Sequence, residues 1–167
     1  TIRDIFEKHY YELIELPIYE YYQDIEYTFS EDMKSKMYRM VDRDTGKMIA
    51  LRPDMTSLLA KLVKIKKDEM NHPERLYYMG KVFRYEKIKA GIYREIKQAG
   101  IELIGEDKVK ADIEVLSMAV EILKKLGVKN PKIEIGDVRI FNAVFEKLGL
   151  NRDQVWELKE VINRKDI

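Results

Sequence analysis

A row of charged and amide side chains in residues 77–105 is the part of the sequence best suited to bind a ligand. Two runs rich in aromatic and β-branched residues, 77–85 and 94–104, flank a basic loop that contains Gly91, which predicts a long antiparallel hairpin. Side chains two residues apart in a strand point to the same face. The even-numbered polar residues should therefore share a face and form a candidate small-molecule site. They are Arg84, Glu86, Arg94, Gln98 and Glu102.

Two of these charges stand in apolar surroundings. Glu102 lies within the apolar run 101–104, and Arg84 lies between two aromatic residues. An ion is costly to bury unless it meets a partner. Arginine binds a carboxylate or phosphate through two parallel hydrogen bonds, and a carboxylate holds an ammonium or a protonated imidazole. The pair suits a zwitterionic ligand, whereas cross-strand ion pairs on a solvated sheet face, worth about 0.2–1 kcal/mol each, explain the same charges without a ligand.

A second group of polar residues, Arg-Pro-Asp-Met-Thr at 52–56, stands where a predicted strand meets a predicted helix. Asp54 or Thr56 would cap this helix, because both residue types accept hydrogen bonds from free backbone N–H groups. Both side chains would also suit the amine of a ligand. The two interpretations are compatible, so residues 52–56 are a candidate part of the same site.

Hairpins that alternate with helices must position these groups. Hydrophobic periodicity and turn residues predict helices over 2–10, 57–67, 108–126, 138–148 and 153–163, strands over 13–19, 37–41, 47–51 and 131–135 beside the long hairpin, and a loop over 21–36. In the helix over 108–126, an apolar stripe is predicted to face inward: Ile113, Leu116, Val120 and Leu123. We expect an α+β fold in which an antiparallel sheet is flanked by helices that pack on one side, as a single domain over residues 1–167.

Composition limits the classes of function. The 31 basic and 30 acidic residues nearly cancel, so the chain has no overall field that would attract nucleic acid or an acidic membrane. There is no cysteine and no long apolar run, which argues against disulfides, thiolate metal sites and a membrane span, and a cytoplasmic location is expected. His9 and His72, the two histidines, lie far apart in the sequence, so we expect no metal site.

Three segments resemble the class II aminoacyl-tRNA synthetases. Residues 13–20, which contain Pro17, are similar to the first class II motif, and residues 83–94 are similar to the second. The segment QAGIELIG at 98–105 resembles the part of the histidyl branch that binds the substrate histidine. The resemblance covers nearly the whole chain and implies a class II synthetase-like catalytic core.

In a synthetase, the resemblance implies that Arg84 holds the ATP α-phosphate and the amino-acid carboxylate. Glu86 would contact the adenine, and Arg94 would complete an ATP site that works with Mg-ATP. Ile96 departs from this pattern, because class II synthetases place an aromatic residue there to stack on adenine.

Two relatives within this branch differ at residues 52–56. Histidyl-tRNA synthetases typically carry LRPEGT where this chain has LRPDMT, and the Asp-Met form resembles HisZ, the family of ATP phosphoribosyltransferase regulatory subunits. Residues 41–56 and 133–150 are also similar to HisZ, although HisZ proteins often carry histidine at the position of Asp137. The resemblance therefore favours the regulatory branch.

The resemblance to HisZ implies a non-catalytic regulatory subunit. Its partner would be the short catalytic form of ATP phosphoribosyltransferase, which transfers phosphoribosyl from phosphoribosyl pyrophosphate to ATP in histidine biosynthesis and requires this subunit. No cofactor or metal is expected. The synthetase-like site would sense histidine, with Arg84 on the carboxylate and four residues on the amine and imidazole: Asp54, Thr56, Gln98 and Glu102. A homodimer through residues 13–22, within a hetero-oligomer, is also implied.

Two alternatives remain at this stage. The chain could be the catalytic core of a histidyl-tRNA synthetase, which activates histidine with Mg-ATP and charges tRNA, or a sheet scaffold that binds partners and no histidine. Relatives begin with a Pro-Gly-rich segment and continue to a third class II motif, and neither is found here. We therefore expect the domain to be incomplete at both ends.

Overall fold

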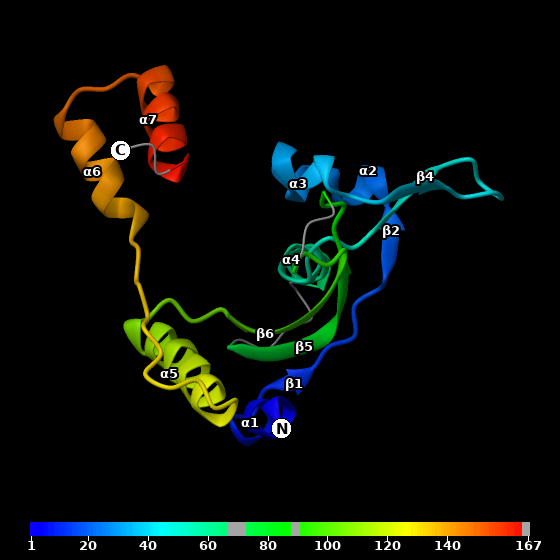
Figure 1. Cartoon of the computed structure of the whole chain (residues 1–167), viewed down its shortest axis with the longest axis horizontal. Coiled ribbons are helices and arrows are strands. Elements are labelled where there is room, and N and C mark those ends of the chain that lie inside the picture. Colours follow the sequence, from blue (N-terminus) through cyan, green and yellow to red (C-terminus); the bar gives the residue numbers. More distant parts are fainter. Residues whose placement is uncertain (67–72, 88–90, 165–167) are drawn as a thin grey trace. The chain divides into compact units, whose positions relative to one another are not determined.

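The computed structural model describes residues 1–66, 73–87 and 91–164. The chain divides into two compact units, Thr1–Lys129 (unit 1) and Asn130–Ile167 (unit 2) (Figure 1). The sequence analysis treats residues 1–167 as one domain and places a strand at 131–135. That strand is wrong, because residues 131–137 have no regular structure and so add nothing to a sheet.

The predicted long hairpin forms the centre of unit 1. β5 (Glu74–Phe83) and β6 (Glu95–Ile104) pair antiparallel along their whole length. β1 (Glu12–Leu13) lies on the other edge of β5 and runs parallel to it, in the order β1-β5-β6. The hairpin is confirmed, and the short parallel pair makes this sheet mixed and not purely antiparallel.

A second, antiparallel sheet contains β2 (Tyr19–Tyr21), β4 (Met48–Leu51) and β3 (Arg39–Val41), in the order β2-β4-β3. The predicted hairpin over 37–51 is confirmed. Its turn is stabilised by Asp42, whose carboxylate oxygen Oδ1 accepts a hydrogen bond from the backbone N–H of Asp44 at 2.9 Å.

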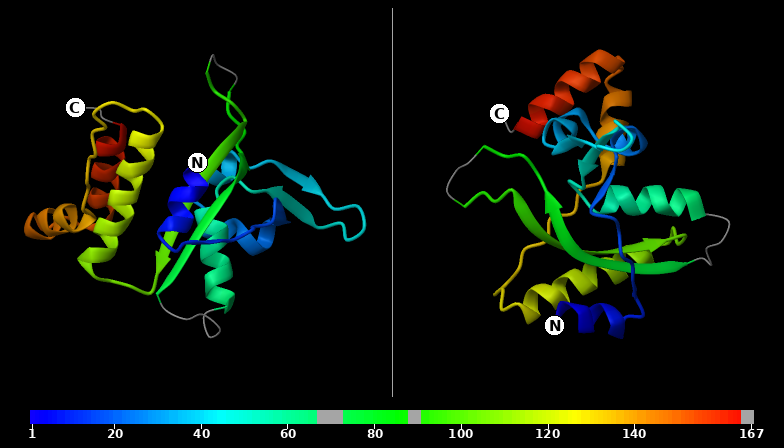
Figure 2. Two further views of the ribbon diagram at one scale, coloured as in Figure 1. Left: turned by 90° about the horizontal axis from the view of Figure 1, so that it is seen from below. Right: turned by 90° about the vertical axis from the view of Figure 1, so that its right-hand side faces the viewer.

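Helices cover both faces of the first sheet, so the prediction that they pack on one side is wrong (Figure 2). α4 (Thr56–Lys66) packs on the face that carries Tyr78, while α1 (Ile2–Lys8) and α5 (Val109–Lys125) pack on the face that carries Tyr77. The physical reason lies in β5, where consecutive residues 76–78 are all buried and apolar. A strand that is apolar on both faces needs cover on both.

The inward stripe of α5 also differs from the prediction. Ala111 and Met118 are buried, whereas Ile113 is 57% exposed. An ion pair joins the buried side of the helix to the sheet: the guanidinium of Arg75, on β5, donates to the carboxylate of Glu114 at 2.8 and 3.0 Å. Glu114 lies on the same side of α5 as the two buried residues, so the ion pair and the apolar contacts act together.

Residues 22–35 contain short helices in place of the predicted loop. They are α2 (Tyr22–Ile25), the 3-10 turn η1 (Glu26–Thr28) and α3 (Glu31–Ser35). Ile25 is fully buried in the core beside α4. Helices of four or five residues are too short to show a hydrophobic period, which is why the sequence pattern does not reveal them.

Unit 2 consists of the two predicted helices, α6 (Val138–Lys147) and α7 (Arg152–Arg164). Asp137 caps α6, because its side chain accepts a hydrogen bond from the backbone N–H of Arg139 at 2.8 Å.

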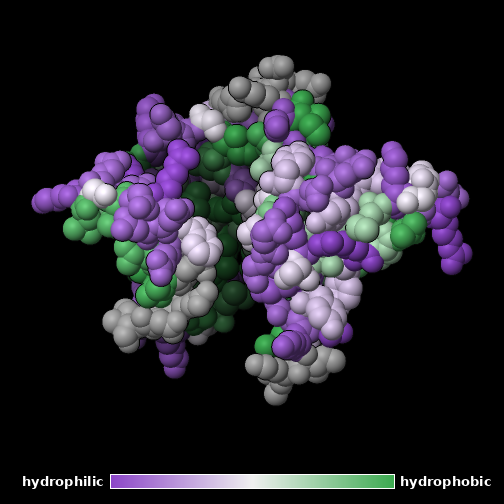
Figure 3. Space-filling model, turned by 90° about the horizontal axis from the view of Figure 1, so that it is seen from above, coloured by the Kyte–Doolittle hydropathy of each residue, from purple (hydrophilic) through white to green (hydrophobic). Residues whose placement is uncertain are grey.

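Hydrophilic side chains cover much of the face shown in Figure 3, as expected for a chain with 37% charged residues. Over the part of the chain that the structure describes, no helix is long and apolar enough to cross a bilayer.

Candidate functional site

The structure confirms the predicted common face for two of the five polar residues, both on β6. Gln98 and Glu102 point to the face covered by α4, because they stand opposite Gly80 and Leu76 in the antiparallel register. The alternation of a strand does not place the other three polar residues, since β5 ends at Phe83 and β6 begins at Glu95. Hydrogen bonds place them instead.

Asp54 joins the two predicted parts of the site. Its Oδ1 accepts a hydrogen bond from Gln98 Nε2 at 3.1 Å and lies 3.8 Å from Arg84 Nη2. Its Oδ2 accepts a hydrogen bond from the backbone N–H of Ser57 at 3.1 Å, which confirms that Asp54 caps α4. Arg84 is held from the same side, because its Nε donates to the carbonyl of Pro53 at 2.8 Å.

Gln98 carries an acceptor that has no partner within the described residues. Its Oε1 is buried and accepts no hydrogen bond, while its Nε2 is used by Asp54. Leaving a buried acceptor unpaired costs about 1–3 kcal/mol. A donor from a water or a bound molecule would satisfy it, so this oxygen is a candidate contact for a ligand.

Thr56 contacts Tyr78, a residue that the sequence analysis does not single out. The hydroxyl of Tyr78 lies 2.9 Å from Thr56 Oγ1, and the side chain is only 3% exposed. Burial raises the pKa of Tyr78; the hydrogen bond from Thr56 opposes this, and the carboxylates of Glu102 and Asp54 raise the pKa further. The site therefore contains a protonated phenol close to two carboxylates.

Arg52, the first residue of the Arg-Pro-Asp-Met-Thr segment, has a structural role. It is 6% exposed, and burial lowers the pKa of its guanidinium. The guanidinium donates to the carbonyl of Lys81 at 2.7 Å, to that of Pro17 at 3.2 Å and to that of Leu16. Arg52 thus ties the chain before Asp54 to β5 and to the connection between β1 and β2.

A Cβ atom at position 80 of β5 would lie 2.7 Å from Arg52 Nη2 and 2.7 Å from Met55 Cε. Real Cβ atoms do not approach other heavy atoms so closely, so the guanidinium can pass over the strand only at a glycine. Gly80 is therefore part of the arrangement that fixes residues 52–55.

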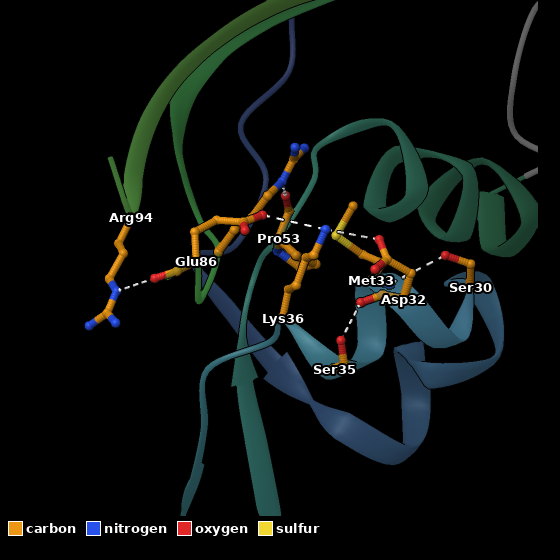
Figure 4. A network of polar contacts seen from close by, with 9 residues as sticks. Ser30, Asp32, Met33, Ser35, Lys36, Pro53, Glu86 and Arg94 are labelled. Carbon is orange, nitrogen blue, oxygen red and sulfur yellow. Dashed lines mark hydrogen bonds and ion pairs between the residues drawn. The ribbon is translucent and has the colours of Figure 1, made fainter. Parts of the chain in front are cut away.

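The residues expected to form an ATP site in a synthetase belong to a polar network that reaches α3 (Figure 4). Arg94 Nε donates to the backbone carbonyl of Glu86 at 3.0 Å, and its guanidinium lies 4.4 Å from the ring centre of Tyr85. The Glu86 carboxylate lies 3.5 Å from Lys36 Nζ, which also bonds Asp32 at 3.0 Å. In this network Glu86 faces a lysine that the sequence analysis does not connect with it.

Comparison with known proteins now assigns the chain to a family. The sequence profile described as Histidyl-tRNA synthetase matches residues 1–167. The chain belongs to the histidyl-tRNA synthetase family. Two curated relatives, from Halothermothrix orenii and Geobacter metallireducens, are 40% and 38% identical over 99% of this chain, and both are named ATP phosphoribosyltransferase regulatory subunit. The chain spans about 40% of the length of these relatives.

Solved structures of the histidyl-tRNA synthetase family show the same fold. A Bacillus halodurans protein described as an ATP phosphoribosyltransferase regulatory subunit/histidyl-tRNA synthetase matches 99% of this chain and 42% of its own, with a TM-score of 0.87 and 30% identity. Apo histidyl-tRNA synthetase of S. aureus matches 77% of this chain and 29% of its own, with a TM-score of 0.58 and 29% identity. The predicted class II synthetase-like α+β core is thereby confirmed.

The histidyl-tRNA synthetase family assignment leaves the roles of individual residues as predictions, but the structure shows which of them meet. Asp54 contacts both Gln98 and Arg84, and Thr56 contacts Tyr78, whose pKa the Glu102 carboxylate raises. The departures from the family pattern lie elsewhere: Ile96 packs against the apolar core beside α4, and Asp137 caps α6 in unit 2. Within the described residues, no group of three or more potential ligands could hold a metal ion.

Proposed function

We propose that this protein is a regulatory subunit of ATP phosphoribosyltransferase that senses histidine through its synthetase-like site. The observation that carries the proposal is the name of the relatives. The proteins from Halothermothrix orenii and Geobacter metallireducens, 40% and 38% identical in sequence, are named regulatory subunits of that enzyme. The chain spans about 40% of the length of these relatives, so their role as whole proteins is carried over here as a proposal. The subunit is non-catalytic in this proposal and needs no cofactor.

The chemistry of the site supports histidine as the ligand. Asp54, Glu102 and the unpaired Oε1 of Gln98 offer acceptors to an ammonium and an imidazole N–H. Arg84 offers a guanidinium, 30% exposed, to a carboxylate. One cationic group and several acceptors, supplied by β6 and by the segments that flank α4 and β5, match the charges of a zwitterionic amino acid with a nitrogenous side chain.

Regulation requires that histidine bind one state of the complex better than another, since a ligand with equal affinity for both shifts no equilibrium. The short catalytic subunit would be active only when bound to this protein. Histidine bound near Asp54 would then favour the less active arrangement of the complex. The effector and the active site would thus lie on different subunits.

The test is a titration of the complex with the short catalytic subunit. Phosphoribosyl transfer to ATP should require both proteins and fall when histidine is added, and calorimetry should detect histidine binding. Replacing Arg84 by Ala and Glu102 by Gln together should remove that binding. Glu95→Gln is the matched control, because Glu95 is an exposed residue on the opposite face of the same strand. Unchanged histidine affinity in the double variant would exclude this site.

A second candidate function, histidine-tRNA ligation, is favoured by the family profile and by the retained set Arg84, Glu86 and Arg94. In that case Arg84 would stabilise the charge that develops on the α-phosphate, with Mg-ATP and tRNA as further ligands. Histidine-dependent exchange of pyrophosphate into ATP by the protein distinguishes the two. Robust exchange would show that the protein is a synthetase and would refute the regulatory proposal.

A further inference from the structure

One position on the edge of β5 that faces β1 has no backbone partner among the described residues. On this edge the carbonyl of Tyr77 accepts a hydrogen bond from the N–H of Ile14 at 2.9 Å. Further along, the carbonyl of Lys81 accepts one from Arg52 Nε at 2.7 Å. Backbone groups of alternate strand residues point to the same edge, so the N–H and the carbonyl of Met79 point there as well. Met79 therefore presents one donor and one acceptor between two positions that are already bonded.

The side chain of Arg52 brings a buried positive charge to the same edge. It is 6% exposed, its Nε and Nη1 donate to three backbone carbonyls, and its Nη2 lies over Gly80. Nη2 donates to no group in the described part of the chain, and no carboxylate there forms an ion pair with the guanidinium. Burial is accordingly the cause that lowers its pKa. A bound anion would offset the cost of burying this charge.

Arg52 and Met79 border a cavity of about 270 Å³. Apolar side chains from the connection between β1 and β2, together with Met55 and Met79, form much of its lining. Its charged residues are Arg3, Arg52 and Glu15, and Glu15 is exposed, so positive charge exceeds negative charge around the cavity. None of the residues proposed to bind histidine borders it, so this cavity is separate from the candidate histidine site.

We propose that this cavity binds a small carboxylate with a short apolar chain. One carboxylate oxygen would accept from Arg52 Nη2 and the other from the N–H of Met79, while the chain would lie against the apolar lining. Alternate residues of a strand are about 7 Å apart, a distance that a carboxylate accepting two hydrogen bonds of about 3 Å can bridge. The inference goes beyond the proposed function and does not depend on it.

The experiment is an NMR titration of the protein with sodium butyrate, at an ionic strength held constant with sodium chloride. We expect the amide proton of Met79 to shift in a saturable way as it gains an acceptor. Urea unfolding should move to higher urea, because a ligand of the folded state raises the folding equilibrium constant about elevenfold at ten times its Kd. Butyramide, which has a similar shape and no charge, is the matched control and should give neither effect.

Two variants assign the effect to this cavity. Arg52→Leu should abolish the butyrate-dependent shift of the Met79 amide. If that variant fails to fold, Ile18→Glu decides, because Ile18 borders the cavity and is 54% exposed, so its replacement leaves the core intact. The added carboxylate would take the place of the ligand, and butyrate should then neither shift the Met79 amide nor stabilise the fold. Ile18→Gln, which has the same shape without the charge, should retain both effects.

Four results would overturn the proposal. The lack of a saturable shift at Met79 would show that water alone fills the cavity, and equal effects of inorganic phosphate would show an adventitious ion only. Butyrate binding that weakens as the protein concentration rises, with light scattering that detects a dimer, would show that a second copy of the chain covers the cavity. Competition between butyrate and saturating histidine would place the ligand in the histidine site instead.

Discussion

Replacing Arg52 by Leu should lower the free energy of unfolding by about 3–5 kcal/mol. The guanidinium is 6% exposed and donates to backbone carbonyls of Leu16, Pro17 and Lys81. Each buried acceptor left without a donor costs about 1–3 kcal/mol. Leucine avoids the cost of desolvating a charge, which offsets part of that sum, so we expect a net loss in the range typical of a broken buried polar network.

Urea unfolding followed by circular dichroism measures this change. Arg39→Leu is the matched control, because Arg39 is exposed, donates to the carbonyl of Lys34 at 2.6 Å and stacks on Tyr22 at 4.2 Å. Its replacement should cost less than about 1 kcal/mol, as expected of a surface contact. Equal stability of the Arg52 and Arg39 variants would show that the carbonyls bound by Arg52 find other donors. It would refute the conclusion that Arg52 stabilises the contact between these segments.

Three further predictions follow from single contacts. The hydrogen bond from Arg75 lowers the pKa of Glu114, so this carboxylate should stabilise the fold above its ordinary pKa and lose that effect as the pH falls through the lowered value; Glu114→Gln should flatten the dependence of urea unfolding on pH in this acid range. Gly80→Ala should cost about 1–3 kcal/mol in the same assay, because its Cβ would lie 2.7 Å from two side-chain atoms, whereas Gly136→Ala, with open space around it, should be nearly neutral. Asp54→Asn should keep the cap of α4 and the melting temperature but weaken histidine binding at least tenfold by calorimetry, since asparagine caps as well as aspartate and lacks its charge.

The parts of the fold that could be predicted from the sequence depend on local signals. The alternation in residues 94–104 defines β6, and it correctly places Gln98 and Glu102 on one face. Asp54 before an apolar stripe is a local helix-start signal, and the structure confirms the cap. Each of these predictions needs no more than a few neighbouring residues.

The parts that could not be predicted depend on contacts between distant segments. Arg52 donates to carbonyls 29 and 36 residues away, and no periodicity encodes such pairs. Tyr78 looks like an ordinary apolar strand residue until Gly100 is placed opposite it. The three consecutive apolar residues at 76–78 are a local signal for helices on both faces of the sheet, because consecutive buried positions in a strand require cover on both faces. This signal contradicts the predicted one-sided packing of the helices.

Asp54 and Met55 have different roles at the start of α4, one in hydrogen bonding and the other in packing. Asp54 divides its oxygens, with Oδ2 on the helix cap and Oδ1 on Gln98 and Arg84. Met55 is 2% exposed and fills the space above Gly80. Histidyl-tRNA synthetases typically carry Glu-Gly here, and glutamate would extend the carboxylate by one methylene while glycine would leave that space empty. In this chain the carboxylate is therefore one methylene shorter, and the methionine side chain packs over Gly80. In the proposed regulatory function, both differences would belong to a site that binds histidine without activating it.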